Sequence, residues 1–314
     1  MGSTLKGIFS VGFGYSMLRV TTPILFAALG AVVSEKAGAV NIGLEGLMLI
    51  SGVTGVIVSA WTQSAWLGLL AGLVLAVLFA LFMGYFHIKL GTDMVLAGIA
   101  MNVIASGGTV FALFVASGDR GISSSLASKV LPTVELPLIN KIPVIGPILS
   151  GHNVLTYFAL LAVVGVWYFL YRTPLGLRLR AVGESPDSAD SVGISVSKMR
   201  FLALGISGFL AGFGGCHLSM GYVSWFSRDM TAGRGFIGLA ASALGGVHPI
   251  GTAIASLFFG FADALSNYMQ SLSIPSEFVQ MIPYLATVAA LGVFARRQIS
   301  RERKGKKQAG REVA

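Results

Sequence analysis

The chain has little charge and almost no cysteine. Only 11% of its 314 residues are charged and 54% are hydrophobic, whereas about a quarter of the residues in a typical soluble domain are charged. Cys216 is the single cysteine, so neither an internal disulfide nor a thiolate metal cluster can form within the chain. This composition predicts an integral membrane protein.

Motifs for catalysis are also missing from the sequence. No GxxxxGK[ST] phosphate-binding loop occurs, so ATP would have to be hydrolysed on another chain. No nucleophile, acid–base pair or metal cluster converges anywhere along the chain. Metal-ligand spacing and paired carboxylates are absent around the four histidines, His87, His152, His217 and His248. The sequence therefore predicts neither an enzyme nor a bound metal or cofactor.

Long apolar runs dominate the chain instead. A helix needs about 20 largely apolar residues to cross a bilayer. Runs near that length lie at residues 7–33, 65–86, 93–117, 152–171, 199–217, 248–269 and 277–295, and shorter ones at 46–60 and 235–247. We expect an all-α polytopic bundle of about eight to ten membrane helices, forming one transmembrane domain over residues 1–314. The two shorter runs leave open whether they cross completely.

The basic residues predict the orientation in the membrane. The tail, residues 296–314, carries eight Lys or Arg and two Glu, and the loop 172–200 is also rich in arginine. The positive-inside rule places both segments in the cytoplasm, and counting runs back from them places 118–151 and the N-terminus outside. A basic tail can also bind nucleic acid, but we interpret this one as a topology anchor near anionic lipid.

A weak internal repeat relates the two halves of the chain. Residues 41–49 (NIGLEGLML) resemble residues 236–244 (FIGLAASAL), and a glycine-punctuated apolar run follows each. The repeats, about 17–117 and 199–295, would have opposite topology, as in many transporters. Glycine clusters at 38–46 and 233–238 interrupt both repeats at matching positions. Irregular backbone at membrane depth is tolerated where protein covers it or where it lines a cavity, so these breaks indicate the translocation path.

The loop 172–200 contains the signals for one very short helix. Ser185 is an N-cap residue, Pro186 fits the first helical position, Asp187 faces the positive end of the helix dipole, and Gly193 ends the helix. A helix of under two turns is unstable alone, so the membrane helices must hold it. It either presents a rigid knob to a soluble partner or belongs to an ordinary cytoplasmic loop.

Three segments resemble the permease subunits of ATP-binding-cassette importers for ribose, branched-chain amino acids and nucleosides, and above all bacterial nucleoside permeases. They are residues 23–49, 180–194 and 235–251. The resemblance implies a prokaryotic cell-membrane protein whose partners are an ATP-binding subunit, a second permease (paralogous or identical) and an extracellular or periplasmic substrate-binding protein. It also implies that helix 186–193 docks on the ATPase. The residues it assigns to this coupling are Arg180, Glu184, Ser185, Pro186, Asp187, Ala189, Asp190 and Gly193. Many relatives have Asn and Ala where this chain has Ser185 and Ser188.

Polar and aromatic residues inside the apolar runs are candidates for the solute pathway, because polar groups in lipid are functional or paired. We select Asn41, Glu45, Asn102, Phe236, Asp263 and Asn267. Glu45 fits either a cavity or an ion pair with Lys36 or Arg234, and Asn102 fits either a solute or a neighbouring helix. Asp263 requires a partner or a cavity, whereas Asp93 is expected to be a helix N-cap.

Three classes of function remain, and the first is favoured. In that class the chain is the permease subunit of an ATP-driven importer for a small neutral polar solute. A nucleoside is preferred, followed by a simple sugar and then a branched-chain amino acid. The second is an ion-coupled secondary transporter that uses Asp263 and Glu45, and the third is an intramembrane enzyme.

Overall fold

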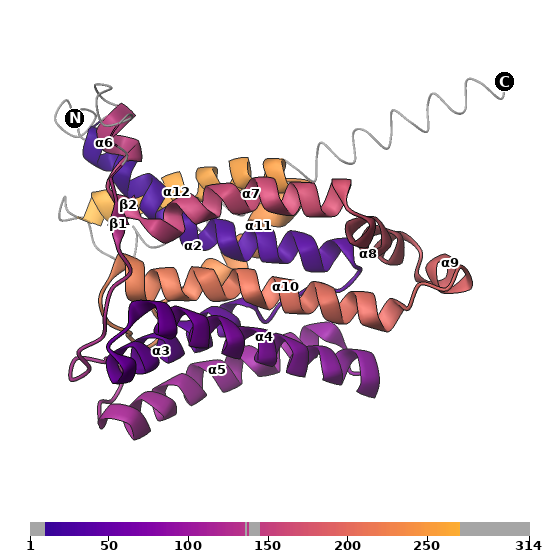
Figure 1. The fold of residues 1–314 in the computed structure, drawn as a ribbon, viewed down its shortest axis with the longest axis horizontal. Helices are drawn as coiled ribbons and strands as arrows, with labels where there is room; N and C mark the ends of the chain where they lie inside the picture. Colours follow the sequence, from indigo (N-terminus) through magenta and orange to yellow (C-terminus); the bar gives the residue numbers. More distant parts are fainter. Residues whose placement is uncertain (1–9, 136, 138–144, 271–314) are drawn as a thin grey trace.

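The computed structural model describes residues 10–135, 137 and 145–270, and the described part is a helical bundle (Figure 1). Within these residues, seven helices are long and apolar enough to cross a membrane. They are α2 (Val11–Lys36), α3 (Leu44–Thr62), α4 (Ala65–Leu90), α5 (Met94–Ser117), α7 (Val154–Arg172), α10 (Val196–His217, continued by the π-helical turn η2, Leu218–Tyr222) and α12 (Pro249–Gln270). Strands within the described residues are limited to the pair β1 (Thr133–Val134) and β2 (His152–Asn153). The all-α fold class is confirmed.

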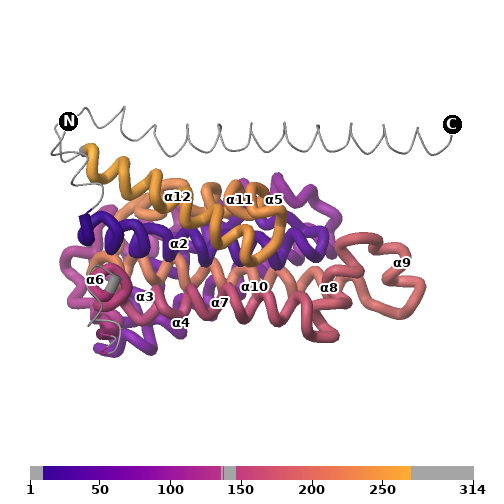
Figure 2. The backbone as a smooth tube through the Cα atoms, turned by 90° about the horizontal axis from the view of Figure 1, so that it is seen from above, coloured from indigo at the N-terminus to yellow at the C-terminus, as the bar shows by residue number. Residues whose placement is uncertain are grey.

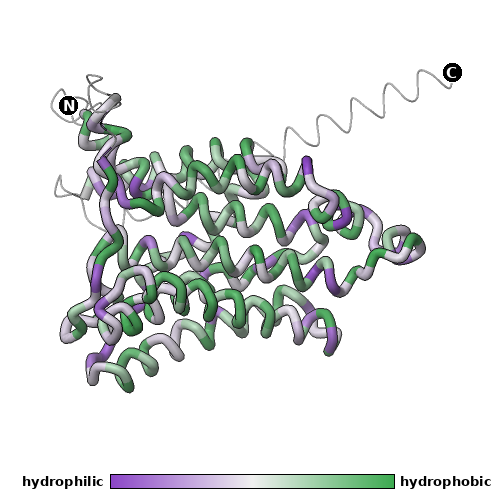
Figure 3. The backbone as a smooth tube through the Cα atoms, viewed as in Figure 1, coloured by the Kyte–Doolittle hydropathy of each residue, from purple (hydrophilic) through white to green (hydrophobic). Residues whose placement is uncertain are grey.

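Four shorter helices complete the described residues. These are α6 (Ile145–Leu149), α8 (Pro174–Glu184), α9 (Pro186–Ser191) and α11 (Arg234–Leu244). In Figures 1 and 2, α8 and α9 extend past one end of the bundle, which we call the α9 end. Figure 3 shows hydrophobic residues along most of the length of the long helices, with hydrophilic residues gathered toward their ends, as expected for helices in a bilayer.

Contacts at helix ends fix the direction of each crossing. The Tyr15 hydroxyl, near the start of α2, donates to the Gly151 carbonyl before α7 (2.9 Å), far from α9. The His248 ring lies 5.2 Å from that of Tyr171 at the α9 end, and the Tyr268 ring lies 6.3 Å from that of Phe13 at the opposite end. Helices α2 and α12 therefore run antiparallel. The predicted run 277–295 and the tail 296–314 lie outside the described residues.

Helix α2 is the centre of the bundle, and every residue from Val20 to Ser34 is buried. Pro23 interrupts its hydrogen bonding, because proline has no N–H to donate to the Arg19 carbonyl four residues earlier. The Nε2 atom of His217 on α10 lies 3.4 Å from that oxygen, so the imidazole donates the bond that the helix lacks. This buried histidine stabilises the bundle and needs no catalytic role.

Two helices begin after irregular backbone, as the glycine clusters predicted. Helix α3 starts at Leu44 after residues 37–43, and α11 starts at Arg234 after residues 223–233. The structure distinguishes the two shorter apolar runs, 46–60 and 235–247, by their helix lengths. With 19 residues α3 is long enough to span a membrane, whereas α11 has 11 residues and covers about 16 Å. The Ser242 hydroxyl near the end of α11 donates to Glu35 at the end of α2 (3.0 Å), so α11 runs toward the α9 end.

Small residues allow close helix packing within the chain. Gly208 and Gly212 of α10 form a GxxxG pattern that packs on Ala80 and Ala76 of α4, so this pattern is used inside one subunit. Asp93 is the N-cap of α5, as expected, since its Oδ1 accepts from the N–H groups of Val95 (2.9 Å) and Leu96 (3.0 Å).

Candidate docking helix and solute pathway

Helix α9 forms where the sequence signals predicted a short helix. The Ser185 hydroxyl accepts from the Ser188 N–H (3.4 Å) and donates to the Ser188 hydroxyl (2.7 Å), which caps the first turn. The helix ends at Ser191, and Gly193 follows with a φ of +81°. Residues other than glycine rarely adopt this left-handed conformation. The serine at 188 therefore adds a side-chain bond that holds the N-cap hydroxyl in place.

Helix α8 holds α9 in place. Leu179 and Val182 of α8 are fully buried, and Gly183 lies so close to the Lys36 carbonyl that no side chain would fit there. On α9, Ala189 is buried, while Asp187 and Asp190 are exposed. Val192, just after α9, is 73% exposed at the end of the bundle. The short helix thus presents two carboxylates and one apolar side chain on a supported base.

Arg180 is engaged inside the chain. Its Nε donates to the Leu170 carbonyl in the last turn of α7 (3.0 Å), and its guanidinium lies 4.7 Å from the centre of the Tyr171 ring. The arginine therefore satisfies a free carbonyl at a helix C-terminus and ties α8 to α7. Glu184, at the end of α8, is exposed.

The first helix break is closed by two asparagines. Asn41 is fully buried; its side chain donates to Ser207 (2.9 Å) and accepts from the Gly43 N–H (3.0 Å). Asn102 on α5 accepts from the Gly46 N–H (2.8 Å) and donates to the Ile42 carbonyl (3.0 Å). Of the alternatives for Asn102, the structure shows the bond to neighbouring backbone. Both amides replace hydrogen bonds that the interrupted helix lacks.

Glu45 connects the two breaks. Its Oε1 accepts from the Gly233 N–H and its Oε2 from the Gly235 N–H, both at 2.7 Å. Of the two alternatives for Glu45, the ion pair with Lys36 or Arg234 is not among the two salt bridges formed by the described residues. The carboxylate instead binds the free N–H groups at the positive end of α11, where an anion is favoured. A β-carbon on Gly235 would lie 2.5 Å from the Glu45 nitrogen, so this approach requires glycine.

Asp263 has the partner that its depth required. Its Oδ2 accepts from Arg234 Nη2 (3.0 Å), and both side chains are about 15% exposed (15% and 14%). Arg234 also donates to the carbonyls of Met230 and Thr231 (both 3.3 Å), so the pair joins the second break to α12. Asn267, one turn further along α12, is exposed in the chain, and Phe236 is 47% exposed.

The structure adds two residues that the sequence analysis did not select. The Ser106 hydroxyl of α5 donates to Asp229 Oδ1 (3.0 Å), and the Asp229 side chain is 55% exposed. Ser106 lies one turn from Asn102 on the same side of α5. We call Glu45, Asn102, Ser106, Asp229 and Phe236 the mid-membrane patch. An aspartate just before the second glycine cluster, 233–238, was the available sequence signal.

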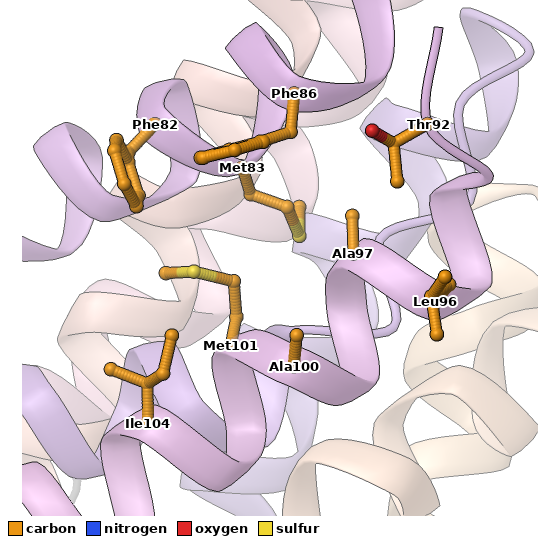
Figure 4. Close-up of a pocket in the computed structure, with 9 residues that line it drawn as sticks. All are labelled: Phe82, Met83, Phe86, Thr92, Leu96, Ala97, Ala100, Met101 and Ile104. Carbon is orange, nitrogen blue, oxygen red and sulfur yellow. The ribbon is translucent and has the colours of Figure 1, made fainter. Parts of the chain in front are cut away.

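Two cavities lie along α5, and their linings include no residue of this patch. One, of about 330 Å³, separates α4 from α5, and Figure 4 shows its lining of Phe82, Met83, Phe86, Thr92, Leu96, Ala97, Ala100, Met101 and Ile104. The Thr92 hydroxyl is the single polar side-chain group in this lining, so the cavity does not suit a polar solute. The second, of about 140 Å³, includes Thr54 and Thr109. Within the described residues, no group of three or more His, Cys, Asp or Glu could hold a metal ion.

A bundle with a supported helix at one end and two joined helix breaks at mid-depth has the features of a membrane permease. Residues 15–291 match the family described as branched-chain amino acid transport system / permease component, and the chain belongs to this family. It is 37% identical to the guanosine ABC transporter permease NupQ of Bacillus subtilis over 288 residues, 88% of this chain and 90% of that protein.

Two further relatives have similar coverage. The nucleoside ABC transporter permease NupC of Lactococcus lactis is 35% identical over 298 residues, 91% of this chain and 92% of NupC. The putative glucose ABC transporter permease TsgC13 of Haloferax volcanii is 32% identical over 307 residues, 90% of this chain and 91% of TsgC13. No solved structure matches the chain significantly.

Proposed function

We propose that this chain is the permease subunit of an ATP-driven nucleoside importer. The observation that carries the proposal is the full-length similarity to permeases named for guanosine and nucleosides, in a chain whose one end presents the supported helix α9. A simple sugar is the second candidate solute, favoured by the similarity to a protein named as a putative glucose permease.

Coupling to the ATPase subunit is assigned to α9. Asp187, Asp190 and Val192 are the exposed groups that would enter a groove on that subunit. Ser185, Pro186, Ala189 and Gly193 shape and seat the helix, and Glu184 adds a third exposed carboxylate at its base. Arg180 acts indirectly by fixing α8 to α7. A push on α9 would pass through α8 into α2, because Gly183 packs on the Lys36 carbonyl.

The solute pathway is assigned to the face of α5, α3 and α11 that carries the mid-membrane patch. Helix α5 buries a single stripe, mainly against α3, and leaves most of its other side chains exposed. A second permease, paralogous or identical, would cover this face and complete the pathway. Asn41, Asn102, Glu45 and Asp263 build its wall, whereas Phe236 and Asn267 have exposed side chains.

The remaining topology follows from the charge pattern. Helix α12 leads to the end opposite α9, so one further crossing by run 277–295 would return the basic tail to the cytoplasm beside α9. The two sequence repeats, about 17–117 and 199–295, would then be inverted halves joined by Glu45. A prokaryotic cell membrane is the expected location.

Reconstitution tests the proposal. The chain would be assembled in proteoliposomes with its ATPase, a second permease and its binding protein, and uptake of radiolabelled guanosine measured with ATP, with ADP, and without the binding protein. Uptake is expected with ATP and the binding protein together. Gradient-driven uptake by this chain alone would overturn the proposal and favour a secondary transporter.

A further inference from the structure

Asp229 is a charged group that lies level with the middle of the long helix α5. Its partner Ser106 lies 12 residues after Met94 and 11 residues before Ser117, so it is close to the midpoint of α5. At a rise of 1.5 Å per residue this is about 17 Å from either end of the helix. The Asp229 carboxylate is 3.0 Å from the Ser106 hydroxyl and therefore lies at the same depth.

This depth conflicts with the exposure of Asp229 unless water reaches it. A carboxylate that is 55% exposed at the bilayer centre cannot face lipid, because an ionised side chain there is strongly unfavourable. Its other partner is the adjacent Arg228 (3.3 Å), which is 69% exposed, and such open ion pairs are weak. The side chain therefore faces away from lipid, toward the second permease and the aqueous pathway that the two subunits would enclose.

The backbone holds Asp229 in position rather than letting it relax. Its φ is +52°, a left-handed conformation that aspartate adopts more often than most residues, and neighbouring hydrogen bonds constrain it here. The constraint comes from the Arg228 N–H, which donates to the Gly121 carbonyl (2.6 Å), and from the Ala232 N–H, which donates to the Asp229 carbonyl (2.9 Å).

The chemistry of the contact indicates the ligand. Each oxygen of an ionised carboxylate accepts hydrogen bonds, and Asp229 has accepting capacity left after binding one hydroxyl and one guanidinium N–H. Ser106 shows that an alcohol hydroxyl fits its Oδ1. We propose that Asp229 binds the vicinal hydroxyl groups of the solute, those of a ribose ring, and that the Ser106 hydroxyl occupies this place between transport cycles. Phe236, exposed in the same patch, would face the flat base.

This inference rests on the proposed function and deepens it. The vicinal hydroxyls could belong to a nucleoside or to a free sugar, and both sources are included in the experiment. The complete importer in proteoliposomes would be assayed for initial rates with guanosine and with 2′,3′-dideoxyguanosine, and for competition by ribose and by glucose. The readout is the ratio of kcat/KM for the two nucleosides. Because the same binding protein is present in every preparation, a change in this ratio belongs to the permease.

Three variants distinguish a loss of solute binding from a structural effect. Asp229→Asn is expected to reduce the preference for guanosine by about tenfold or more, the usual effect of losing a hydrogen bond to a charged group. Ser106→Ala leaves the carboxylate free and is expected to keep the preference. Asp119→Asn is the matched control, because Asp119 also binds a serine hydroxyl (Ser125, 2.6 Å) but lies in the loop after α5.

The outcomes distinguish the two proposals. If Ser106→Ala and Asp229→Asn change the ratio equally, the contact only joins α5 to the loop and the inference is wrong. The inference is also wrong if Asp229→Asn keeps the wild-type ratio. Competition by ribose or glucose that is lost in Asp229→Asn would identify a sugar as the ligand. If the wild-type importer takes up no nucleoside with ATP, the proposed function itself fails.

Discussion

Removing the Glu45 carboxylate should free the start of α11. In Glu45→Ala the N–H groups of Gly233 and Gly235 both lose their acceptor at 2.7 Å. Hydrogen bonds to a charged group are each worth about 1.5–3 kcal/mol, so opening the first turn of α11 should become easier by about 3–6 kcal/mol. Since Glu45 is only partly buried, we expect a value near the lower limit.

Hydrogen exchange in lipid nanodiscs measures this opening directly. Every 1.4 kcal/mol changes an equilibrium tenfold, so amides at 233–237 should exchange at least about 100-fold faster in Glu45→Ala. Glu45→Gln keeps one acceptor oxygen and should lie between the variant and the wild type. Glu135→Gln, an exposed glutamate after β1, is the control. Wild-type exchange at 233–237 in a folded Glu45→Ala protein would refute the capping role.

Three further predictions concern other regions. Gly193→Val places a branched side chain at φ +81°, and this left-handed conformation costs about 1–2 kcal/mol. The variant should hydrolyse ATP without coupling hydrolysis to uptake, and parallel ATPase and transport assays check this. Arg234→Met should lower the free energy of unfolding of the purified chain by about 3–5 kcal/mol, because it leaves Asp263 unpaired. The double variant Arg234→Met with Asp263→Leu should recover most of this loss. Burial lowers the pKa of His152 below its usual 6.5, so the unfolded chain binds its proton first, and stability should fall as pH drops below about 6.5. Thermal unfolding between pH 5 and 8 should show this fall, and His152→Gln should reduce it.

Local features of the fold could be predicted from the sequence because their causes are local. Ser185, Pro186 and Gly193 lie close together in the sequence and act on the two ends of one short helix, so the short helix and its N-cap were predicted correctly. Glycine clusters marked both helix breaks, although hydrophobicity alone could not tell that α3 is long enough to span a membrane and α11 is not.

Partners across the fold could not be predicted in this way. Glu45 binds backbone N–H groups 188 and 190 residues away, and backbone groups leave no signature in the sequence. The sequence offered a cavity or the charged side chains of Lys36 and Arg234 as alternatives, because only side chains can be read from it. Asp229 was missed for a related reason. It lies in a short polar segment typical of a loop, and its depth is revealed only by Ser106, 123 residues earlier.

The polar residues of the apolar runs fall into two groups, those bonded within the chain and those with exposed side chains, and residue type does not separate the groups. Asn41, Asn102 and Asp263 bind other parts of the chain, and each restores hydrogen bonds or charge balance that a broken helix would otherwise lose. Groups committed in this way cannot release their partners to a passing solute without unfolding the breaks. Solute binding at this depth therefore has to come from side chains with free capacity, which are Asp229 and Phe236 among the described residues of the mid-membrane patch. The committed groups keep the wall rigid, so that a push on α9 moves the pathway as a unit instead of deforming it.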